Sequence, residues 1–133
     1  MAKTAILVVD DSVTIRAMME VLLERDTSLE VVGVARDADE AFALIAETDP
    51  DVITLDIAMP GTDGMQILRK IMSTQPRPVI MLSSLMREGS ELRETATAIG
   101  AAGCFNKNHI LRDADTLIAM IKDVAFRRGH RPV

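Results

Sequence analysis

The sequence predicts an α/β fold: a single-domain, doubly wound, five-stranded parallel sheet with five helices on its two faces. Short, continuous apolar runs alternate along the chain with longer segments whose apolar residues recur every three or four positions. The first pattern is typical of a strand buried on both faces, and the second of an amphipathic helix. The 133 residues suit one domain, and 48% of them are hydrophobic with only three Phe as aromatics, so the core must be aliphatic.

The first half of the chain contains three predicted strands and two predicted helices. The strands are residues 5–9 (AILVV), 29–35 (LEVVGVA) and 52–55 (VITL), and the last of them ends at Asp56. Ser12 is a typical helix cap, and apolar residues follow it at helical spacing over about 15–22. A second helix is expected over about 38–47, and Pro50 separates it from the third strand.

The second half continues the alternation. A turn-rich loop over 59–64 precedes a helix that begins near Met65, and Pro76 and Pro78 break the chain before the fourth strand. The remaining elements are strands over 79–82 and 102–105 and helices over 88–99 and 113–126. The helix over 88–99 has a thin apolar face, so we expect its contact with the core to be weak.

Parallel strands joined by right-handed crossover helices allow only a few strand orders. Among these, the flavodoxin-like order 2-1-3-4-5 is usual for domains of this kind, and we adopt it. In such sheets a ligand binds at the carboxyl ends of the strands, close to the point between strands 1 and 3 where the order reverses. A functional site is therefore expected at that edge.

Polar residues follow four of the five predicted strands. Asp10 and Asp11 follow the first, Asp56 ends the third, Ser83 ends the fourth, and Lys107 lies just past the fifth. Each alone has an ordinary explanation as a cap or a solvated charge, but together they converge at one edge. Three adjacent carboxylates repel one another unless a cation or protons neutralise them, and Mg²⁺ prefers oxygen ligands of this kind. A carboxylate nucleophile, a hard metal, a lysine and a hydroxyl are what phosphoryl transfer requires.

Composition excludes other classes of protein. The net charge of −5 argues against nonspecific attraction to nucleic acid, and the scarcity of aromatic residues argues against stacking on bases. The single cysteine, Cys104, forms no internal disulfide, as expected in a reducing compartment. With no long apolar stretch and no signal-peptide pattern at the start, we expect a cytoplasmic protein that does not bind a membrane.

The motifs around these residues resemble the receiver domain of two-component response regulators. The resemblance is carried by residues 8–12 (VVDDS), 54–64 (TLDIAMPGTDG) and 78–84 (PVIMLSS). It spans about residues 4–126, and residues 52–84 are most similar to receivers attached to chemotaxis methylesterases. We expect a stand-alone receiver domain over 1–126 and a basic C-terminal tail over 127–133, with no esterase or other output domain following.

The resemblance implies a role for each residue at the expected site. Asp56 would accept a phosphoryl group from a phosphohistidine of a sensor histidine kinase or a histidine phosphotransfer protein. Asp11, Asp56 and the backbone carbonyl of Ala58 would bind Mg²⁺ directly, and Asp10 would bind it through a water. Lys107 would pair with the phosphoryl oxygens.

The resemblance also implies how a signal would leave the site. Ser83 would reorient to hydrogen-bond the aspartyl phosphate and shift the population toward an active arrangement. A downstream protein, unknown from the sequence, would bind the face formed by the fourth helix, fifth strand and fifth helix. The chain would catalyse its own phosphorylation and dephosphorylation, without turning over a separate substrate.

Three features depart from the usual receiver pattern. Cys104 stands three residues before the active lysine, where an aromatic is common, and strand alternation points Phe105 to the opposite face. Asn108 replaces the usual proline after the lysine, so this peptide bond should be trans and its loop more mobile. Ala58 and Leu85 stand two residues after the phosphoacceptor and two after the serine. The resemblance implies that these positions tune the lifetime of the phosphoryl group, and two apolar side chains there predict slow autodephosphorylation.

Other functions are left open. Cys104 and Asn108 motivate a degenerate receiver that docks a partner without phosphorylation, although the complete set of site residues argues against it. A phosphate sink is compatible with the same residues. A Mg²⁺-dependent phosphatase with Asp56 as nucleophile is disfavoured, because Ala58 cannot act as the general acid that one such family has two residues later.

Overall fold

The computed structural model describes residues 3–59, 62–84 and 91–127. The main elements are β1 (Thr4–Val9), α1 (Val13–Leu23), β2 (Leu29–Ala35), α2 (Ala38–Thr48), β3 (Val52–Asp56), α3 (Gly64–Thr74), β6 (Val79–Ser83), α4 (Glu91–Ile99), β7 (Gly103–Asn106) and α5 (Ala114–Arg127). Three short elements complete the set: the strands β4 (Ala58–Met59) and β5 (Thr62–Asp63), and the 3₁₀ helix η1 (Lys107–His109). Every strand and helix expected from the sequence is present, with bounds that differ by a few residues.

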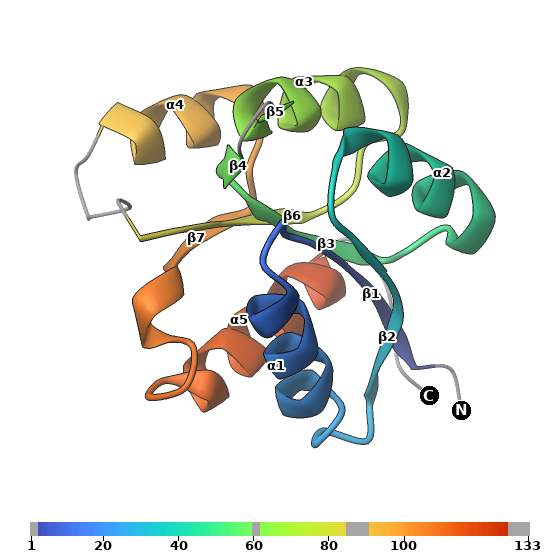
Figure 1. Cartoon of the computed structure of the whole chain (residues 1–133), viewed down its shortest axis with the longest axis vertical. Coiled ribbons are helices and arrows are strands. Elements are labelled where there is room, and N and C mark those ends of the chain that lie inside the picture. Colours follow the sequence, from blue (N-terminus) through green and yellow to red (C-terminus); the bar gives the residue numbers. More distant parts are fainter. Residues whose placement is uncertain (1–2, 60–61, 85–90, 128–133) are drawn as a thin grey trace.

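The five long strands form one parallel sheet in the order β2-β1-β3-β6-β7. In chain order these are strands 2-1-3-4-5, so the expected topology is confirmed. Figure 1 shows α2, α3 and α4 on one face of the sheet and α1 and α5 on the other. The order reverses at β1, which pairs with β2 on one side and β3 on the other, and the carboxyl ends of β1 and β3 therefore lie side by side.

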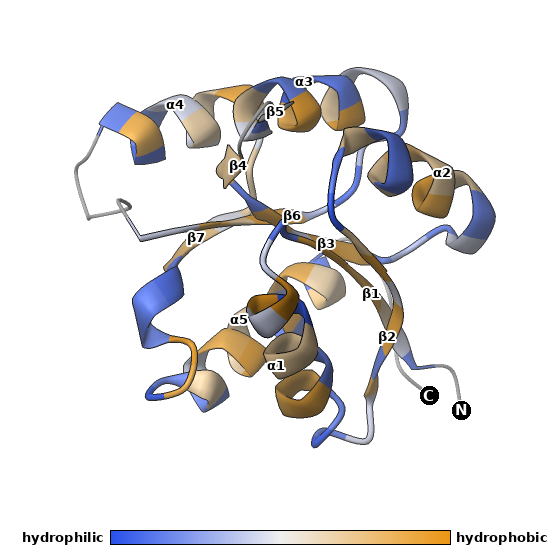
Figure 2. Ribbon diagram, in the orientation of Figure 1, coloured by the Kyte–Doolittle hydropathy of each residue, from blue (hydrophilic) through white to orange (hydrophobic). Residues whose placement is uncertain are grey.

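The sheet separates two aliphatic cores. Alternate residues of each strand point to opposite faces, so Leu7 and Val9 pack toward α2 and α3 while Ile6 and Val8 pack toward α1 and α5. The strands are accordingly hydrophobic over most of their length, and β3, β6 and β7 end in polar residues (Figure 2). Cys104 belongs to the first core and Phe105, on the next position of β7, to the second, as strand alternation predicts.

Side-chain caps fix the helices that follow the strands. The hydroxyl of Ser12 accepts a hydrogen bond from the backbone N–H of Ile15, which confirms the expected cap of α1. Asp37 caps α2 and Asp63 caps α3 in the same way. The turn-rich loop after β3 contains the antiparallel pair β4–β5, which brings Asp63 to the start of α3.

The helix α4 is weakly attached to the core. Among its described residues Ala96 alone is fully buried, and Leu92 and Ile99 are partly buried against the first core. The expected thin apolar face is thus confirmed, while residues 88–90 of the expected helix lie outside the described residues. None of the described helices combines the length and the apolar character needed to cross a bilayer.

Candidate functional site

Three carboxylates meet at the carboxyl ends of β1 and β3. Asp10 follows β1, Asp56 ends β3, and Asp11 is the residue after Asp10. One carboxylate oxygen of each residue lies within 4.8 Å of the others. Asp10 and Asp56 are buried, with 0% and 1% of their surface exposed, whereas Asp11 is exposed. The convergence expected from the strand order is therefore present, with one of the three groups open to solvent.

Lys107 reaches the same point from the far side of β6. It lies in η1, directly after β7, and its side chain is 18% exposed. Its Nζ lies 2.9 Å from Oδ2 of Asp56 and 3.1 Å from Oδ2 of Asp10. The ammonium group thus bridges the two buried carboxylates.

Backbone groups hold the other oxygen of each buried carboxylate. Oδ1 of Asp10 accepts a hydrogen bond of 2.8 Å from the N–H of Ser12, and Oδ1 of Asp56 accepts one of 3.1 Å from the N–H of Ala58. Oδ2 of Asp10 is buried, and its contact with Lys107 lacks hydrogen-bond geometry, so it accepts no hydrogen bond from any described residue. A buried carboxylate oxygen without a donor is a place where an added cation would be stabilising.

The site carries more negative than positive charge. Burial raises the pKa of the Asp56 carboxyl, and the hydrogen bond from Lys107 opposes that change. Burial lowers the pKa of Lys107, but the hydrogen bond to Asp56 and the nearby Asp10 carboxylate together outweigh burial and raise it overall, so it remains an ammonium ion. One ammonium cannot neutralise three carboxylates. The donor set, carboxylate oxygens at one rim of the sheet, therefore fits a hard divalent cation such as Mg²⁺.

Ser83 and Ala58 lie at the same edge. Ser83 is the last residue of β6 and is buried; its neighbour Leu82 pairs with Asp56 in register. Ala58 is exposed two residues after Asp56. Their expected roles, reorientation of the hydroxyl and a metal-binding carbonyl, remain predictions. Leu85, the other residue expected to affect dephosphorylation, lies outside the described residues.

Gly64 is a site residue that the sequence pattern did not single out. A Cβ added to it would lie 2.6 Å from the backbone oxygen of Asp56 and 2.7 Å from Cα of Ile57. The start of α3 therefore packs directly on the backbone of the phosphoacceptor segment, which only a glycine allows. The sequence feature that could have indicated this role is the Asp63-Gly64 pair, a helix cap followed by a residue without a side chain.

Arg16 was also missed. Its Nη1 donates a hydrogen bond of 2.7 Å to the backbone oxygen of Asp10. It lies on α1 one turn after the Ser12 cap, and a single arginine at that position carries no distinctive sequence signal.

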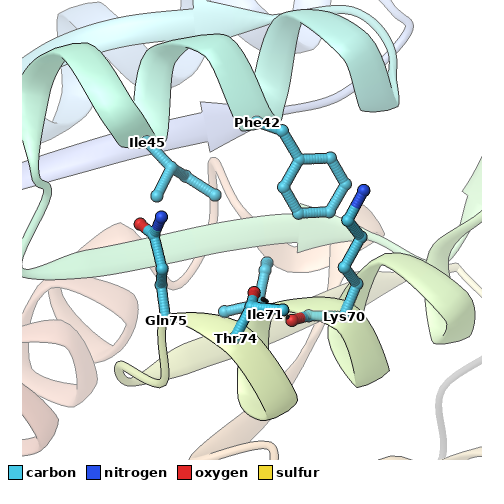
Figure 3. Close-up of a pocket in the computed structure, with 6 residues that line it drawn as sticks. All are labelled: Phe42, Ile45, Lys70, Ile71, Thr74 and Gln75. Atoms are coloured by element: carbon cyan, nitrogen blue, oxygen red, sulfur yellow. Dashed lines mark hydrogen bonds between the residues drawn. The ribbon is translucent and has the colours of Figure 1, made fainter.

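A hollow of about 220 Å³ lies between α2 and α3, and none of the site residues lines it (Figure 3). Its wall includes Phe42 and Lys70, whose Nζ lies 4.4 Å from the centre of the Phe42 ring. The cation–π contact joins the two helices. The acidic cluster is therefore a separate, open site at the edge of the sheet.

The fold and the acidic cluster agree with one protein family. The family model described as the response regulator receiver domain matches residues 6–122. The chain is a member of the response regulator receiver family. Membership implies a histidine kinase as the general class of partner.

Curated relatives show where such receivers occur. The receiver is 47% identical over 107 residues to protein-glutamate methylesterase/protein-glutamine glutaminase 1 of Caulobacter vibrioides, covering 80% of this chain and 31% of that protein. It is 41% identical over 130 residues to the corresponding protein 2 of Nitratidesulfovibrio vulgaris, covering 93% of this chain and 35% of that protein. The receiver thus spans about a third of the length of the curated relatives it matches, and the expected similarity to methylesterase-attached receivers is confirmed.

Solved structures give the same result. The response regulator domain of Thermotoga maritima CheB has a TM-score of 0.88 and 34% identity, covering 92% of this chain and 96% of that one. The Vibrio cholerae chemotaxis protein CheY4 has a TM-score of 0.81 and 28% identity, covering 92% and 99%. Both support the fold.

The structure shows two of the positions at which the sequence departs from the usual receiver pattern, Cys104 and Asn108. Cys104 is buried on β7, and burial raises the pKa of its thiol, so it is a packing residue that cannot swing as an aromatic ring does. The described residues contain no cis peptide bond, so the bond between Lys107 and Asn108 is trans as expected.

Proposed function

We propose that this receiver is a phosphorylation-dependent switch in which Asp56 accepts a phosphoryl group. The observation that carries the proposal is the contact between Oδ2 of Asp56 and Nζ of Lys107, 2.9 Å, beside two further carboxylates. The phosphodonor would be a phosphohistidine of a histidine kinase or of a phosphotransfer protein, and the protein would act in the cytoplasm. It would turn over no separate substrate.

In the transfer, a carboxylate oxygen of Asp56 attacks phosphorus, the phosphorus–nitrogen bond to histidine breaks, and the imidazole takes up a proton. Asp56 is held for the attack by the Ala58 N–H, which restricts rotation of its carboxylate. Lys107, displaced from Oδ2 of Asp56 by the incoming group, remains close enough to pair with the phosphoryl oxygens. Burial of Asp56 strengthens both interactions.

The residues that would hold Mg²⁺ are Asp11, Asp56 and the carbonyl of Ala58, with Asp10 acting through a water. When bound, the cation neutralises the charge that the phosphoryl oxygens bring to the carboxylates. Asp10 would act indirectly, as the family resemblance implies, with its Oδ1 occupied by the Ser12 N–H and its Oδ2 facing Lys107. Asp11 is suited to direct binding because its carboxylate is exposed.

The signal would leave through Ser83 and α4. Ser83 is the last residue of β6, which lies between β3, with its Asp56, and β7, so a movement of its hydroxyl toward the phosphoryl group would change the end of β6, from which the chain leads to α4. The weak attachment of α4 to the core favours a shift of this helix. A downstream protein would recognise the altered α4–β7–α5 face.

The test is the intact mass of the protein after incubation with Mg²⁺ and acetyl phosphate. Wild type should gain one phosphoryl group that hydroxylamine removes, and Asp56→Asn should gain none. Lys107→Met should be labelled slowly or not at all, while Lys3→Met, at an exposed position at the start of β1, should be labelled like wild type. Decay of the adduct over many minutes would agree with the apolar residue at Ala58, and loss within seconds would contradict slow dephosphorylation.

An unlabelled wild type, under conditions that label another receiver, would contradict the proposal. It would favour the phosphorylation-independent docking module that Cys104 and Asn108 motivate. A pull-down with the unphosphorylated protein would then identify the partner.

A further inference from the structure

The peptide that joins Asp10 to Asp11 is held by an arginine. The guanidinium of Arg16, half-buried on α1, donates a 2.7 Å hydrogen bond from Nη1 to the backbone oxygen of Asp10. The bond is charge-assisted, and such bonds are about twice as strong as bonds between neutral groups. The other four N–H groups of Arg16 have no partner among the described residues.

The two acids joined by this peptide are positioned in different ways. Asp10 is fixed by its own contacts: its N–H donates to the oxygen of Ala35 and its Oδ1 accepts from Ser12. The Asp11 carboxylate makes no hydrogen bond or ion pair with any described residue, and it is exposed. The position of the Asp11 carboxylate therefore depends on the orientation of the peptide before it, and the oxygen of that peptide is the one that Arg16 holds.

We propose that Arg16 is a positioning residue that sets how tightly the three carboxylates bind a divalent cation. By fixing the peptide before Asp11, it keeps the Asp11 carboxylate within reach of the other two. The inference rests on the Mg²⁺ site of the proposed function, and it adds a residue that contacts neither the cation nor the phosphoryl group.

Two effects of Arg16 on cation binding oppose each other. Its positive charge repels a cation, but the guanidinium is partly exposed, so solvent and salt screen this repulsion. Its hydrogen bond orders a ligand that would otherwise move freely, and partners of this outer kind typically change metal affinity 10- to 100-fold. Positioning is therefore the larger effect, and loss of Arg16 weakens binding.

The experiment measures the Kd of Mg²⁺ by titration calorimetry at constant ionic strength, with melting temperatures in EDTA as the check on folding. Arg16→Met removes both the charge and the hydrogen bond, and it should bind Mg²⁺ about tenfold more weakly. Arg16→Lys keeps a charged donor and should recover part of the affinity. Arg25→Met, an exposed arginine just after α1, is the matched control and should bind like wild type.

The Mg²⁺ dependence of the labelling rate distinguishes a positioning role of Arg16 from a general loss of structure in the variant. In labelling by acetyl phosphate, Arg16→Met should need about tenfold more Mg²⁺ for half-maximal rate, while its rate at saturating Mg²⁺ stays within twofold of wild type. A folded neutral variant that binds Mg²⁺ as tightly as wild type, or more tightly, overturns the role of Arg16 and leaves the proposed function intact. A wild type that binds no Mg²⁺ overturns the metal site itself, and this inference with it.

Discussion

The sheet carries buried charge where its strands begin, the amino edge, and where they end, the carboxyl edge. The charge is paired at the amino edge and unbalanced at the carboxyl edge. At the amino edge Arg77, 7% exposed, donates to Oδ1 of Asp49, the oxygen of Pro50 and two oxygens of Gln75. At the carboxyl edge three carboxylates share one ammonium, and a buried oxygen of Asp10 accepts no hydrogen bond from any described residue. A charge that is fully paired has only a structural role. In an unbalanced cluster, like charges repel one another, and binding a ligand of opposite charge relieves that repulsion.

Arg77 joins loops that are distant in the sequence. It lies in the loop between α3 and β6, and its partners Asp49 and Pro50 lie between α2 and β3. The same edge holds Asp51, whose Oδ2 accepts from the N–H of Ala5 at the start of β1. The amino edge thus connects three neighbouring strands through side chains, while at the carboxyl edge Lys107, after β7, connects to the carboxylates after β1 and at the end of β3.

Loss of Arg77 should have the largest effect on stability. Arg77→Met leaves the buried oxygen of Pro50 without its donor, and we expect unfolding free energy to fall by about 3 kcal/mol. Urea unfolding measures the change, with Arg69→Met, at an exposed position on α3, as the control. Labelling of Asp56 by acetyl phosphate should be unaffected below the unfolding transition. Slower labelling would show that the two edges are coupled.

Gly64→Ala should come next, and it should damage both stability and labelling. The new Cβ would meet the backbone of Asp56 and Ile57, which cannot move aside, so we expect a loss of about 2 kcal/mol. Gly103→Ala is the control, because its Cβ would meet the flexible end of Met120 at 3.1 Å. Equal losses in the two variants, measured by urea unfolding, would contradict a special fit at Gly64.

Mg²⁺ should stabilise the folded protein through the carboxyl edge. At a concentration ten times Kd, binding to the folded state alone adds about 1.4 kcal/mol and raises the melting temperature. Asp11→Ala should remove most of this response and, by reducing repulsion among the carboxylates, raise the melting temperature in EDTA. Glu20→Ala on the exposed side of α1 is the control. A variant that responds to Mg²⁺ like wild type would disprove the role of Asp11.

The sequence was sufficient for the strands, the helices and most of the carboxyl edge, while the sheet order was adopted from domains of the same kind. Asp10, Asp11, Asp56 and Lys107 were predictable because each follows a strand, and parallel strands bring such positions together. Arg77 was not predictable: a single arginine between two prolines resembles a solvated loop residue until the fold supplies Asp49 and Pro50. Gly64 was visible only as part of the Asp63-Gly64 pair, because its role depends on its close approach to the backbone of Asp56 and Ile57. Arg16 was not predictable, because its side chain binds a backbone oxygen that no residue pattern marks.

Thr54 tests whether an unpaired polar atom always indicates function. It lies in the middle of β3, away from both edges, and its buried Oγ1 has no partner among the described residues. Val8 and Ile80 are its neighbours in register. Thr54→Val removes the unpaired hydroxyl at nearly constant volume, and we expect unfolding free energy to rise by about 1 kcal/mol with labelling unchanged. Thr54→Ser, which keeps the hydroxyl and removes the methyl group, should lower it.

Asp26 lies at the amino edge, in the turn before β2, and should have the smallest effect on unfolding free energy. That effect should depend on pH. Its hydrogen bonds with Ser28 and Lys122 lower its pKa from 3.8 to about 2. A depressed carboxyl pKa stabilises the fold above the unfolded value, so this contribution is complete above about pH 4 and is lost as the pH falls toward 2. The pair with Lys122 is partly exposed and screened, so we expect less than about 1 kcal/mol. Urea unfolding of wild type and Asp26→Asn should therefore differ at pH 5 and converge only as the pH falls below about 2. A difference of unchanged size below about pH 2 would mean that packing of Asp26, and not its charge, is what stabilises this edge.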